Sequence, residues 1–286
     1  MSLLHVIILA VVQGLAELLP VSSSAHVVVA EKLLGLDPSS APMTLLLVML
    51  HTGTMFAVIV YFWRQWRSIY FQSMTAFKEF ARLVVFATVL TGVIGEVIIK
   101  IIEKTAFRGV PHAEIEDLFG HLELIAPALA VAGILILFAG IVEKRKLKGS
   151  AERNDLNTKQ AGIIGAVQGL CLPFRGFSRS GATISAGMLA GVVKSRAEAF
   201  SFALAVVLTP AAVARETLRL VHAGRETATL SATALLSVLG AVFAFLAGLV
   251  ALRWLSAWLE GGRWYLFGIY CLVAAVAVGY LHHLGY

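Results

Sequence analysis

Long apolar segments constrain the fold of this chain more than any other feature. Six predominantly apolar stretches are long enough to cross a bilayer as α-helices, which needs about 20 residues: 44–63, 80–101, 123–142, 197–221, 230–254 and 264–283. Only 14% of the residues are charged and 59% are hydrophobic, whereas about a quarter are charged in soluble domains. The sequence therefore predicts an all-α integral membrane protein.

The remaining composition excludes other classes of protein. The two cysteines, Cys171 and Cys271, lie in apolar segments and suggest no disulfide or metal framework. The net charge of +6 comes from residues in short loops, which is typical of membrane topology signals, so we exclude a nucleic-acid partner. The apolar segment 3–19 is interrupted by Gln13 and Glu17, and we expect it to be retained rather than cleaved as a signal peptide.

Shorter apolar segments stand beside the six spans and form two pairs. Residues 3–19 and 25–36 are separated by Pro20 and three serines, and residues around 158–171 and 182–193 by a break from Pro173 to Ser180. Each piece is too short to cross the bilayer by itself. We predict two re-entrant helical hairpins, which membranes tolerate where the backbone is buried in protein or lines a wet cavity.

The hairpins belong to two similar halves of one membrane domain, 1–286. Val-Gln-Gly-Leu at 12–15 returns at 167–170, and each copy precedes a proline and a serine cluster. Each half, 1–142 and 158–286, contains one hairpin and three spans. Because three crossings invert the second half, the pattern predicts an inverted-topology repeat with a shared site near the midplane. A basic cytoplasmic loop, 143–157, is expected to join the halves.

The charges of the loops predict the orientation in the membrane. The 64–82 and 143–160 loops are rich in Lys and Arg, so we expect both on the cytoplasmic side. The 100–122 loop mixes both signs of charge and is expected outside. Both termini then lie outside, the first hairpin enters from outside, and the second enters from the cytoplasm.

Ionisable groups at membrane depth are costly and mark candidate functional residues. The second hairpin carries Arg179 between Ser178 and Ser180, followed by Gly181 and Thr183 at the start of a helix. A guanidinium with hydroxyls and helix N-terminal amides is a typical phosphate receptor. We therefore predict a phosphate site there.

The first hairpin supplies groups that fit phosphoryl transfer. Glu17, with Gln13 one turn earlier, is interpreted as a ligand of Mg²⁺ or Ca²⁺, because hard cations take oxygen ligands and share them with phosphates. His26 changes protonation near neutral pH, and Ser22 and Ser23 supply hydroxyl groups nearby. Together these residues predict an enzyme that transfers or hydrolyses phosphoryl groups.

Two motifs resemble a known family. Gln-Gly-Leu-Ala-Glu-Leu-Leu-Pro-Val-Ser-Ser-Ser-Ala-His at 13–26 and Gly-Phe-Ser-Arg-Ser-Gly-Ala-Thr at 176–183 closely resemble motifs of the bacterial undecaprenyl-diphosphate phosphatases, the bacitracin-resistance membrane phosphatases. Segments 51–54 and 198–202 also look like family segments. The resemblance implies hydrolysis of a prenyl lipid diphosphate to the monophosphate carrier used in peptidoglycan assembly. It also implies that the protein lies in the bacterial plasma membrane and requires a divalent cation. Its site would open to the outer face.

The resemblance also implies roles for residues. Glu17 would serve the metal, Arg179 with Ser178 and Thr183 would bind the diphosphate, and either Ser23 or His26 would attack it.

Two positions depart from the motifs. Gln13 stands where many members have Glu, which removes a negative charge from the cation site. Arg175 stands where the motif has Pro, and it either tightens diphosphate binding or reaches the cytoplasmic surface. His51 and Glu96, in the spans, are interpreted as packing or hydrogen-bonding groups.

An alternative function is a transporter, or flippase, for a prenyl lipid phosphate, because inverted repeats with broken helices are typical of transporters. A transporter has no need of a cation-binding carboxylate beside a serine and a histidine, so the residues favour an enzyme. We expect contacts with membrane lipids and the lipid diphosphate, and a homodimer is compatible with the sequence.

Overall fold

The computed structural model describes residues 2–37, 40–106, 121–146, 156–222 and 227–285. These residues form ten α-helices and no β-strand. The predicted all-α fold class is therefore confirmed.

Four of the helices are the short pieces predicted for the two hairpins. Their bounds are Leu3–Leu18 for α1, Ser23–Leu33 for α2, Thr158–Cys171 for α6 and Arg179–Leu189 for α7. In each pair a proline follows the end of the first helix, Pro20 after α1 and Pro173 after α6. A proline has no backbone N–H and clashes with the preceding turn, so neither helix continues through it.

The other six helices are longer, with bounds Ala41–Tyr70 for α3, Met74–Ala106 for α4, Leu122–Lys146 for α5, Lys194–His222 for α8, Thr227–Glu260 for α9 and Trp264–His283 for α10. All six contain a stretch long and apolar enough to cross a membrane. The six predicted spans are thus confirmed, and the chain is a multi-pass membrane protein.

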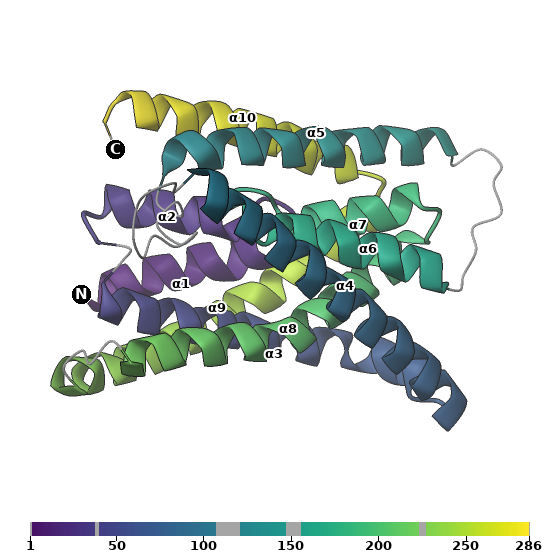
Figure 1. Ribbon diagram of the computed structural model, residues 1–286, viewed down its shortest axis with the longest axis horizontal. Helices are drawn as coiled ribbons and strands as arrows, with labels where there is room; N and C mark the ends of the chain where they lie inside the picture. Colours follow the sequence, from purple (N-terminus) through teal and green to yellow (C-terminus); the bar gives the residue numbers. More distant parts are fainter. Residues whose placement is uncertain (1, 38–39, 107–120, 147–155, 223–226, 286) are drawn as a thin grey trace.

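The two halves repeat the same order of elements, two short helices followed by three long ones. In Figure 1 the α1–α2 pair lies toward one end of the molecule and the α6–α7 pair toward the other, with α5 and α10 side by side along one edge. α1 packs against α9, and α6 packs against α4. The orientation of the halves relative to a bilayer stays a prediction.

Glycines allow the hairpin helices to approach these neighbours closely. A Cβ added at Gly14 on α1 would lie 2.7 Å from the carbonyl oxygen of Ala244 on α9. A Cβ at Gly165 on α6 would lie 2.5 Å from the carbonyl oxygen of Ala87 on α4. Small residues that bring backbones together are the common means of packing membrane helices, and here they hold each hairpin in the interior.

The connections agree with the predicted loop pattern where they are described. The α3–α4 turn and the end of α5 lie at the same end of the molecule as the start of α6 (Figure 1). Residues 143–146, predicted as the start of the linker, instead belong to α5. Residues 107–120 of the predicted outer loop and 147–155 of the linker lie outside the described residues.

The tips of the two hairpins meet in the interior. The backbone N–H of Gly176, in the second break, donates to the Ser24 hydroxyl of the first hairpin at 3.3 Å. Gly176 has a φ of +97°, and a Cβ there would lie 2.4 Å from the carbonyl oxygen of Ile125 on α5. Only glycine meets both conditions without strain, so this position fixes where the second break touches its neighbours.

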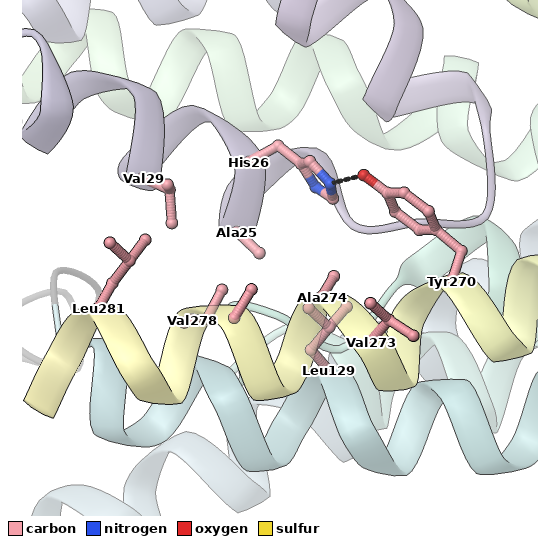
Figure 2. A pocket seen from close by; sticks show the side chains of 10 residues that line it. Ala25, His26, Val29, Leu129, Tyr270, Val273, Ala274, Val278 and Leu281 are labelled. Carbon is pink, nitrogen blue, oxygen red and sulfur yellow. Dashed lines mark hydrogen bonds between the residues drawn. The ribbon is translucent and has the colours of Figure 1, made fainter.

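An apolar cavity of about 320 Å³ lies among α2, α5 and α10 (Figure 2). Alanine, valine and leucine side chains line most of it. His26 and Tyr270 are its polar lining residues, and Figure 2 shows them together at one end. The cavity therefore begins beside the first hairpin and continues along an apolar wall.

Candidate active site

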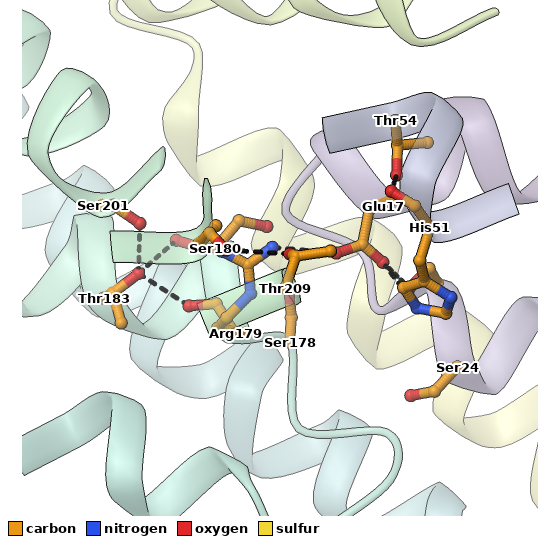
Figure 3. Close-up of polar contacts among 12 residues, drawn as sticks. Glu17, Ser24, His51, Thr54, Ser178, Arg179, Ser180, Thr183, Ser201 and Thr209 are labelled. Atoms are coloured by element: carbon orange, nitrogen blue, oxygen red, sulfur yellow. Dashed lines mark hydrogen bonds and ion pairs between the residues drawn. The ribbon is translucent and has the colours of Figure 1, made fainter. Parts of the chain in front are cut away.

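An ion pair between the two hairpins forms the centre of the site. An Nη2 N–H of Arg179, at the start of α7, donates to Oε1 of Glu17, at the end of α1, at 2.8 Å (Figure 3). The Arg179 and Glu17 side chains retain 22% and 15% of their exposure. Residues 162 positions apart are thus joined at the point where the helices break, and the predicted meeting of acid and guanidinium is observed.

The second carboxylate oxygen of Glu17 accepts two further hydrogen bonds. The Ser23 hydroxyl donates to Oε2 at 2.5 Å, a short charge-assisted bond. The Gln13 amide, buried one helical turn before Glu17, donates to the same oxygen at 3.1 Å. Because Ser23 begins α2, the break after α1 turns its hydroxyl back toward the carboxylate. Glu17 is therefore placed to accept the Ser23 proton.

One nitrogen of the Arg179 guanidinium has no hydrogen-bond partner in the structure. Its Nη2 is bonded to Glu17, whereas its Nη1 is buried and makes no hydrogen bond. A buried donor without a partner costs about 1–3 kcal/mol and calls for an explanation. A phosphate oxygen bound to Nη1 would satisfy it, because the planar fork of Arg presents donors to two groups at once.

His51 on α3 also reaches Glu17, which the sequence interpretation missed. Its Nε2 lies 3.7 Å from Oε2 of Glu17, on the side of the carboxylate away from Arg179 (Figure 3). Its Nδ1 lies 2.8 Å from the Leu47 carbonyl oxygen. The signal that could have found His51 is its place inside an apolar span, where an ionisable side chain is costly. Nothing in the sequence indicated that it faces α1.

His26, predicted as a catalytic group, lines the apolar cavity and points toward Tyr270 (Figure 2). Its Nδ1 lies 2.7 Å from the Ser22 carbonyl oxygen, and its Nε2 lies 2.6 Å from the Tyr270 hydroxyl. A carbonyl oxygen only accepts, so Nδ1 carries the proton and Nε2 accepts from Tyr270. Both ring nitrogens therefore make hydrogen bonds in this arrangement, and the predicted role of His26 as nucleophile stays a prediction.

Two of the predicted hydroxyls cap the helices that follow the breaks. The Ser22 oxygen accepts from the Ala25 backbone N–H at the start of α2, and the Ser178 oxygen accepts from the Gly181 N–H at the start of α7. These are ordinary N-cap bonds. Ser22 is also the one described non-glycine residue with a positive φ, 69°, a conformation that strains an L-residue. These bonds hold the starts of the two helices, and a direct role of either serine in substrate binding stays a prediction.

The hydroxyls of Ser180 and Thr183 bind other parts of the protein. Ser180 donates to the Leu19 carbonyl oxygen of the first hairpin at 3.3 Å. Thr183 donates to the Arg179 carbonyl oxygen at 2.7 Å and lies 2.6 Å from the Ser201 hydroxyl on α8. These bonds hold α7 against its neighbours and fix the backbone that carries the guanidinium. A direct role of either hydroxyl in phosphate binding stays a prediction.

Arg175 lies in the second break and interacts electrostatically with Glu31 on α2. Glu17 forms its ion pairs with Arg179 and His51 among the residues that the structure describes. Glu31 is fully buried, so a nearby guanidinium offsets part of the cost of its charge. The structure thus gives Arg175 a partner that neither sequence interpretation considered.

The oxygen atoms around Glu17 fit a hard divalent cation only in part. Suitable metal ligands are provided by the Glu17 carboxylate, the Gln13 amide oxygen and the Ser23 hydroxyl. Among the described residues, however, no three His, Cys, Asp or Glu side chains are grouped to hold a metal ion. Because Mg²⁺ is commonly held by one or two carboxylates together with substrate phosphates, these residues fit a cation that arrives with a diphosphate.

Comparison with known proteins identifies the family of this chain. Residues 6–277 match the family described as "Bacitracin resistance protein BacA". The chain is 58% identical over 277 residues to "Undecaprenyl-diphosphatase 2" of Acinetobacter baylyi, which covers 95% of each chain. It is 32% identical to proteins of the same name from Burkholderia orbicola and Burkholderia thailandensis, over 96% of this chain and 95% of each relative. This chain therefore belongs to the BacA family of bacitracin-resistance proteins.

Proposed function

We propose that this protein is an undecaprenyl-diphosphate phosphatase, which hydrolyses undecaprenyl diphosphate to undecaprenyl phosphate and inorganic phosphate. The observation that carries the proposal is that the two hairpins bring Glu17, Ser23 and Arg179 into one hydrogen-bonded group. The names of the relatives point to the same activity. Hydrolysis recycles the lipid carrier for peptidoglycan synthesis and accounts for resistance to bacitracin.

The first step transfers the terminal phosphoryl group to Ser23. Arg179 Nη1 donates to the terminal phosphate and holds its phosphorus near the Ser23 hydroxyl. The Ser23 proton passes to Oε2 of Glu17 while Oγ bonds to phosphorus. The bond from phosphorus to the bridging oxygen breaks, and its electron pair leaves on undecaprenyl phosphate. The guanidinium stabilises the charge that builds up on the phosphoryl oxygens.

The second step returns Ser23 to its free form. A water molecule attacks the phosphorus of phosphoserine, with Glu17 as the base that accepts one water proton. Glu17 passes this proton to Oγ of Ser23 as the bond between Oγ and phosphorus breaks, and inorganic phosphate leaves. Glu17 must be an unprotonated carboxylate at the start of both steps.

The contacts support Ser23 over His26 as the nucleophile. Ser23 donates its proton to a carboxylate at 2.5 Å, the arrangement that activates a serine. His26 has one nitrogen on a backbone carbonyl and the other on Tyr270. A phosphohistidine would require His26 to break its bond with Tyr270 and turn toward Arg179.

A divalent cation, Mg²⁺ or Ca²⁺, is part of the proposal. Glu17 and Gln13 would hold it, and diphosphate oxygens would provide further ligands. When bound, it supplies positive charge that reduces the repulsion between the Glu17 carboxylate and the diphosphate. The Gln13 amide, which already bonds to Glu17, keeps that carboxylate in place for both roles.

The apolar cavity among α2, α5 and α10 is proposed to take part of the prenyl chain. It starts at His26, three residues after Ser23, and is otherwise lined mainly by aliphatic side chains. The contact of His26 with Tyr270 marks the border between the polar site and the apolar wall. A lipid whose diphosphate lies at Arg179 would therefore place its first isoprene units along α10.

The location follows from the same substrate. We place the protein in the bacterial plasma membrane, the inner membrane of a Gram-negative cell, with the site open to the periplasmic face. The distribution of basic loops supports this orientation. Labelling single cysteines introduced at position 68, in the predicted cytoplasmic loop, and at position 283, near the C-terminus, would test it in intact cells.

Phosphate release by the protein purified in detergent micelles separates the enzyme from a transporter. An enzyme releases phosphate from undecaprenyl diphosphate in the presence of Mg²⁺ or Ca²⁺, whereas a transporter releases none. Acid quenching during turnover should trap an acid-stable phosphoserine in the wild type and none in Ser23→Ala. Ser68→Ala is the matched control, because the Ser68 hydroxyl is exposed and donates to the Gln65 backbone oxygen within its own helix.

Absence of phosphate release by a folded sample at any cation concentration would overturn the proposed activity. An acid-labile phosphoenzyme that disappears in His26→Ala would keep the activity but transfer the role of nucleophile to His26.

A further inference from the structure

We propose that Ser24 and Ser180 position the two hairpins against each other, so that the Ser23 hydroxyl lies where Arg179 holds the terminal phosphate of the substrate. This inference rests on the proposed function. Ser24 was not among the predicted site residues. Both serines act through the groups that they hold and are therefore positioning residues. We call them the serine pair.

The serine pair occupies equivalent positions in two similar triplets. Residues 22–24 and 178–180 each stand at the start of a short helix, α2 and α7. The first residue of each triplet caps its helix, and the second, Ser23 or Arg179, bonds to Glu17. The third residue of each triplet is the serine that contacts the break of the other hairpin. The two halves thus use the same three positions for a cap, a reacting or binding group, and a link between the hairpins.

The two links join the hairpins in both directions. The Gly176 N–H, in the second break, donates to the Ser24 hydroxyl of the first hairpin at 3.3 Å. The Ser180 hydroxyl of the second hairpin donates to the Leu19 carbonyl oxygen of the first break at 3.3 Å. The Leu19 oxygen also accepts from the Val21 N–H at 2.8 Å, so this link reaches a turn that has its own hydrogen bond. Each break is therefore held by the helix that follows the other break.

The hydrogen bonds of Ser24 distinguish it from the neighbouring nucleophile. Its oxygen accepts from Gly176 and lies 3.2 Å from the Ser22 hydroxyl. A hydroxyl group has one donor and two acceptor positions, so Ser24 can make both contacts at once. Ser23 instead donates to the Glu17 carboxylate at 2.5 Å, the arrangement that activates a serine. The two adjacent serines thus divide positioning and attack between them.

The ion pair by itself would leave the hairpins free to shift. Glu17 and Arg179 have long side chains with many rotamers, so the 2.8 Å contact between their ends is compatible with many backbone arrangements. The serine pair acts through backbone groups and short side chains, which allow fewer arrangements. Gly176 is also fixed from its other side, because a Cβ there would lie 2.4 Å from the Ile125 carbonyl oxygen. The serine pair therefore limits how far Ser23 can move from the phosphate that Arg179 holds.

The test measures phosphoserine formation in single turnovers, with the protein in excess over undecaprenyl diphosphate. We expect Ser24→Ala to slow this step about 10- to 100-fold, because a misplacement of about 1 Å can cost about 100-fold in rate. The protein concentration that gives half of the maximal rate should stay within about twofold, since Arg179 and the apolar cavity still bind the substrate. Ser24→Thr keeps a hydroxyl group and should restore the rate to within about threefold of the wild type.

Ser180→Ala is a second, independent variant, because it removes the link to Leu19 and leaves Ser24 in place. It should also slow phosphoserine formation about 10- to 100-fold with unchanged binding. A Ser180 hydroxyl that bound phosphate directly would instead weaken binding when removed. If Ser24→Ala does not fold, Ser180→Ala provides the same comparison.

Ser185→Ala is the matched control. Ser185 is buried on α7 and accepts from the Trp264 indole N–H on α10 at 3.0 Å, so its bond joins α7 to α10 instead of to the first hairpin. Its loss should lower the melting temperature and change the rate of phosphoserine formation by no more than about twofold, because a neutral hydrogen bond contributes to stability wherever it lies.

Three results would overturn the assignment. One is a folded Ser24→Ala protein that forms phosphoserine at the wild-type rate. Another is a folded Ser24→Thr protein that is as slow as Ser24→Ala. The third is equal slowing in Ser185→Ala, which would show that any weakened packing of a hairpin has this effect. If the wild type itself releases no phosphate, the proposed function fails first, so the two failures are distinguishable.

Discussion

Replacing Arg179 by lysine should separate the two roles of its guanidinium. In the structure Nη2 bonds to Glu17 at 2.8 Å, and Nη1 is buried without a partner. Lysine keeps the positive charge but has one ammonium group, which cannot occupy both nitrogen positions at once. Arg179→Lys should therefore retain the interaction with Glu17 and lose one charge-assisted hydrogen bond to the substrate.

The expected loss follows from the strength of that bond. A hydrogen bond to a charged group contributes about 1.5–3 kcal/mol, and each 1.36 kcal/mol is a factor of ten in rate. We expect kcat/KM for phosphate release to fall about 10- to 150-fold, with a melting temperature close to that of the wild type. Arg179→Ala should lose stability as well, because it leaves the Glu17 carboxylate without its partner.

The assay is phosphate release from undecaprenyl diphosphate in detergent micelles, together with thermal unfolding of the same samples. Arg82→Lys is the matched control. Arg82 pairs with Glu79 at an exposed position, with side-chain exposures of 60% and 53%, and such pairs contribute about 0–1 kcal/mol. If Arg179→Lys keeps kcat/KM within about twofold of the wild type, the assignment of Nη1 to phosphate is wrong.

Three further predictions concern the cation, the second break and the cavity. Gln13→Glu should preserve or raise phosphate release at low Mg²⁺ or Ca²⁺, because a second carboxylate strengthens the cation site; a large loss across a cation titration would show that the amide itself is needed. Gly176→Ala should lower stability by about 2 kcal/mol or more, since alanine is disfavoured at positive φ and its Cβ would meet the Ile125 carbonyl oxygen at 2.4 Å. An unchanged melting temperature would contradict that reasoning. Ala274→Trp should fill the cavity and raise KM for undecaprenyl diphosphate more than for the short farnesyl diphosphate, and equal KM changes for both lipids would exclude the cavity as the prenyl site.

Much of the architecture could be predicted because membrane insertion imposes strong rules on sequence. Length and hydropathy alone placed the six spans, since a helix cannot cross a bilayer below a certain length. Each break was placed by a proline together with the polar residues that follow it, because a proline removes a helical hydrogen bond. Helix ends were less accurate. Residues 143–146 were predicted as the start of a basic loop, yet α5 continues through them, because glutamate, lysine and arginine are all favourable inside helices.

The site was only partly predictable, because sequence gives residue types and spacing but not the direction of a side chain. Glu17 and Arg179 were identified from chemistry that apolar segments rarely contain. The sequence could not show which histidine lies next to Glu17, because this depends on how each helix is rotated about its axis. The break after α1 turns His26 toward Tyr270 on α10, whereas the packing of α3 turns His51 toward Glu17.

The sequence by itself thus determined the membrane class, the ten helical segments and the candidate residues for a phosphate site. Only the tertiary structure decided which of them meet. Contacts between Glu17 and Arg179, 162 residues apart, depend on glycine-mediated packing of each hairpin against a long helix of the other half. Such packing is set by the shapes of whole helices fitted together, and no local pattern in the chain encodes it.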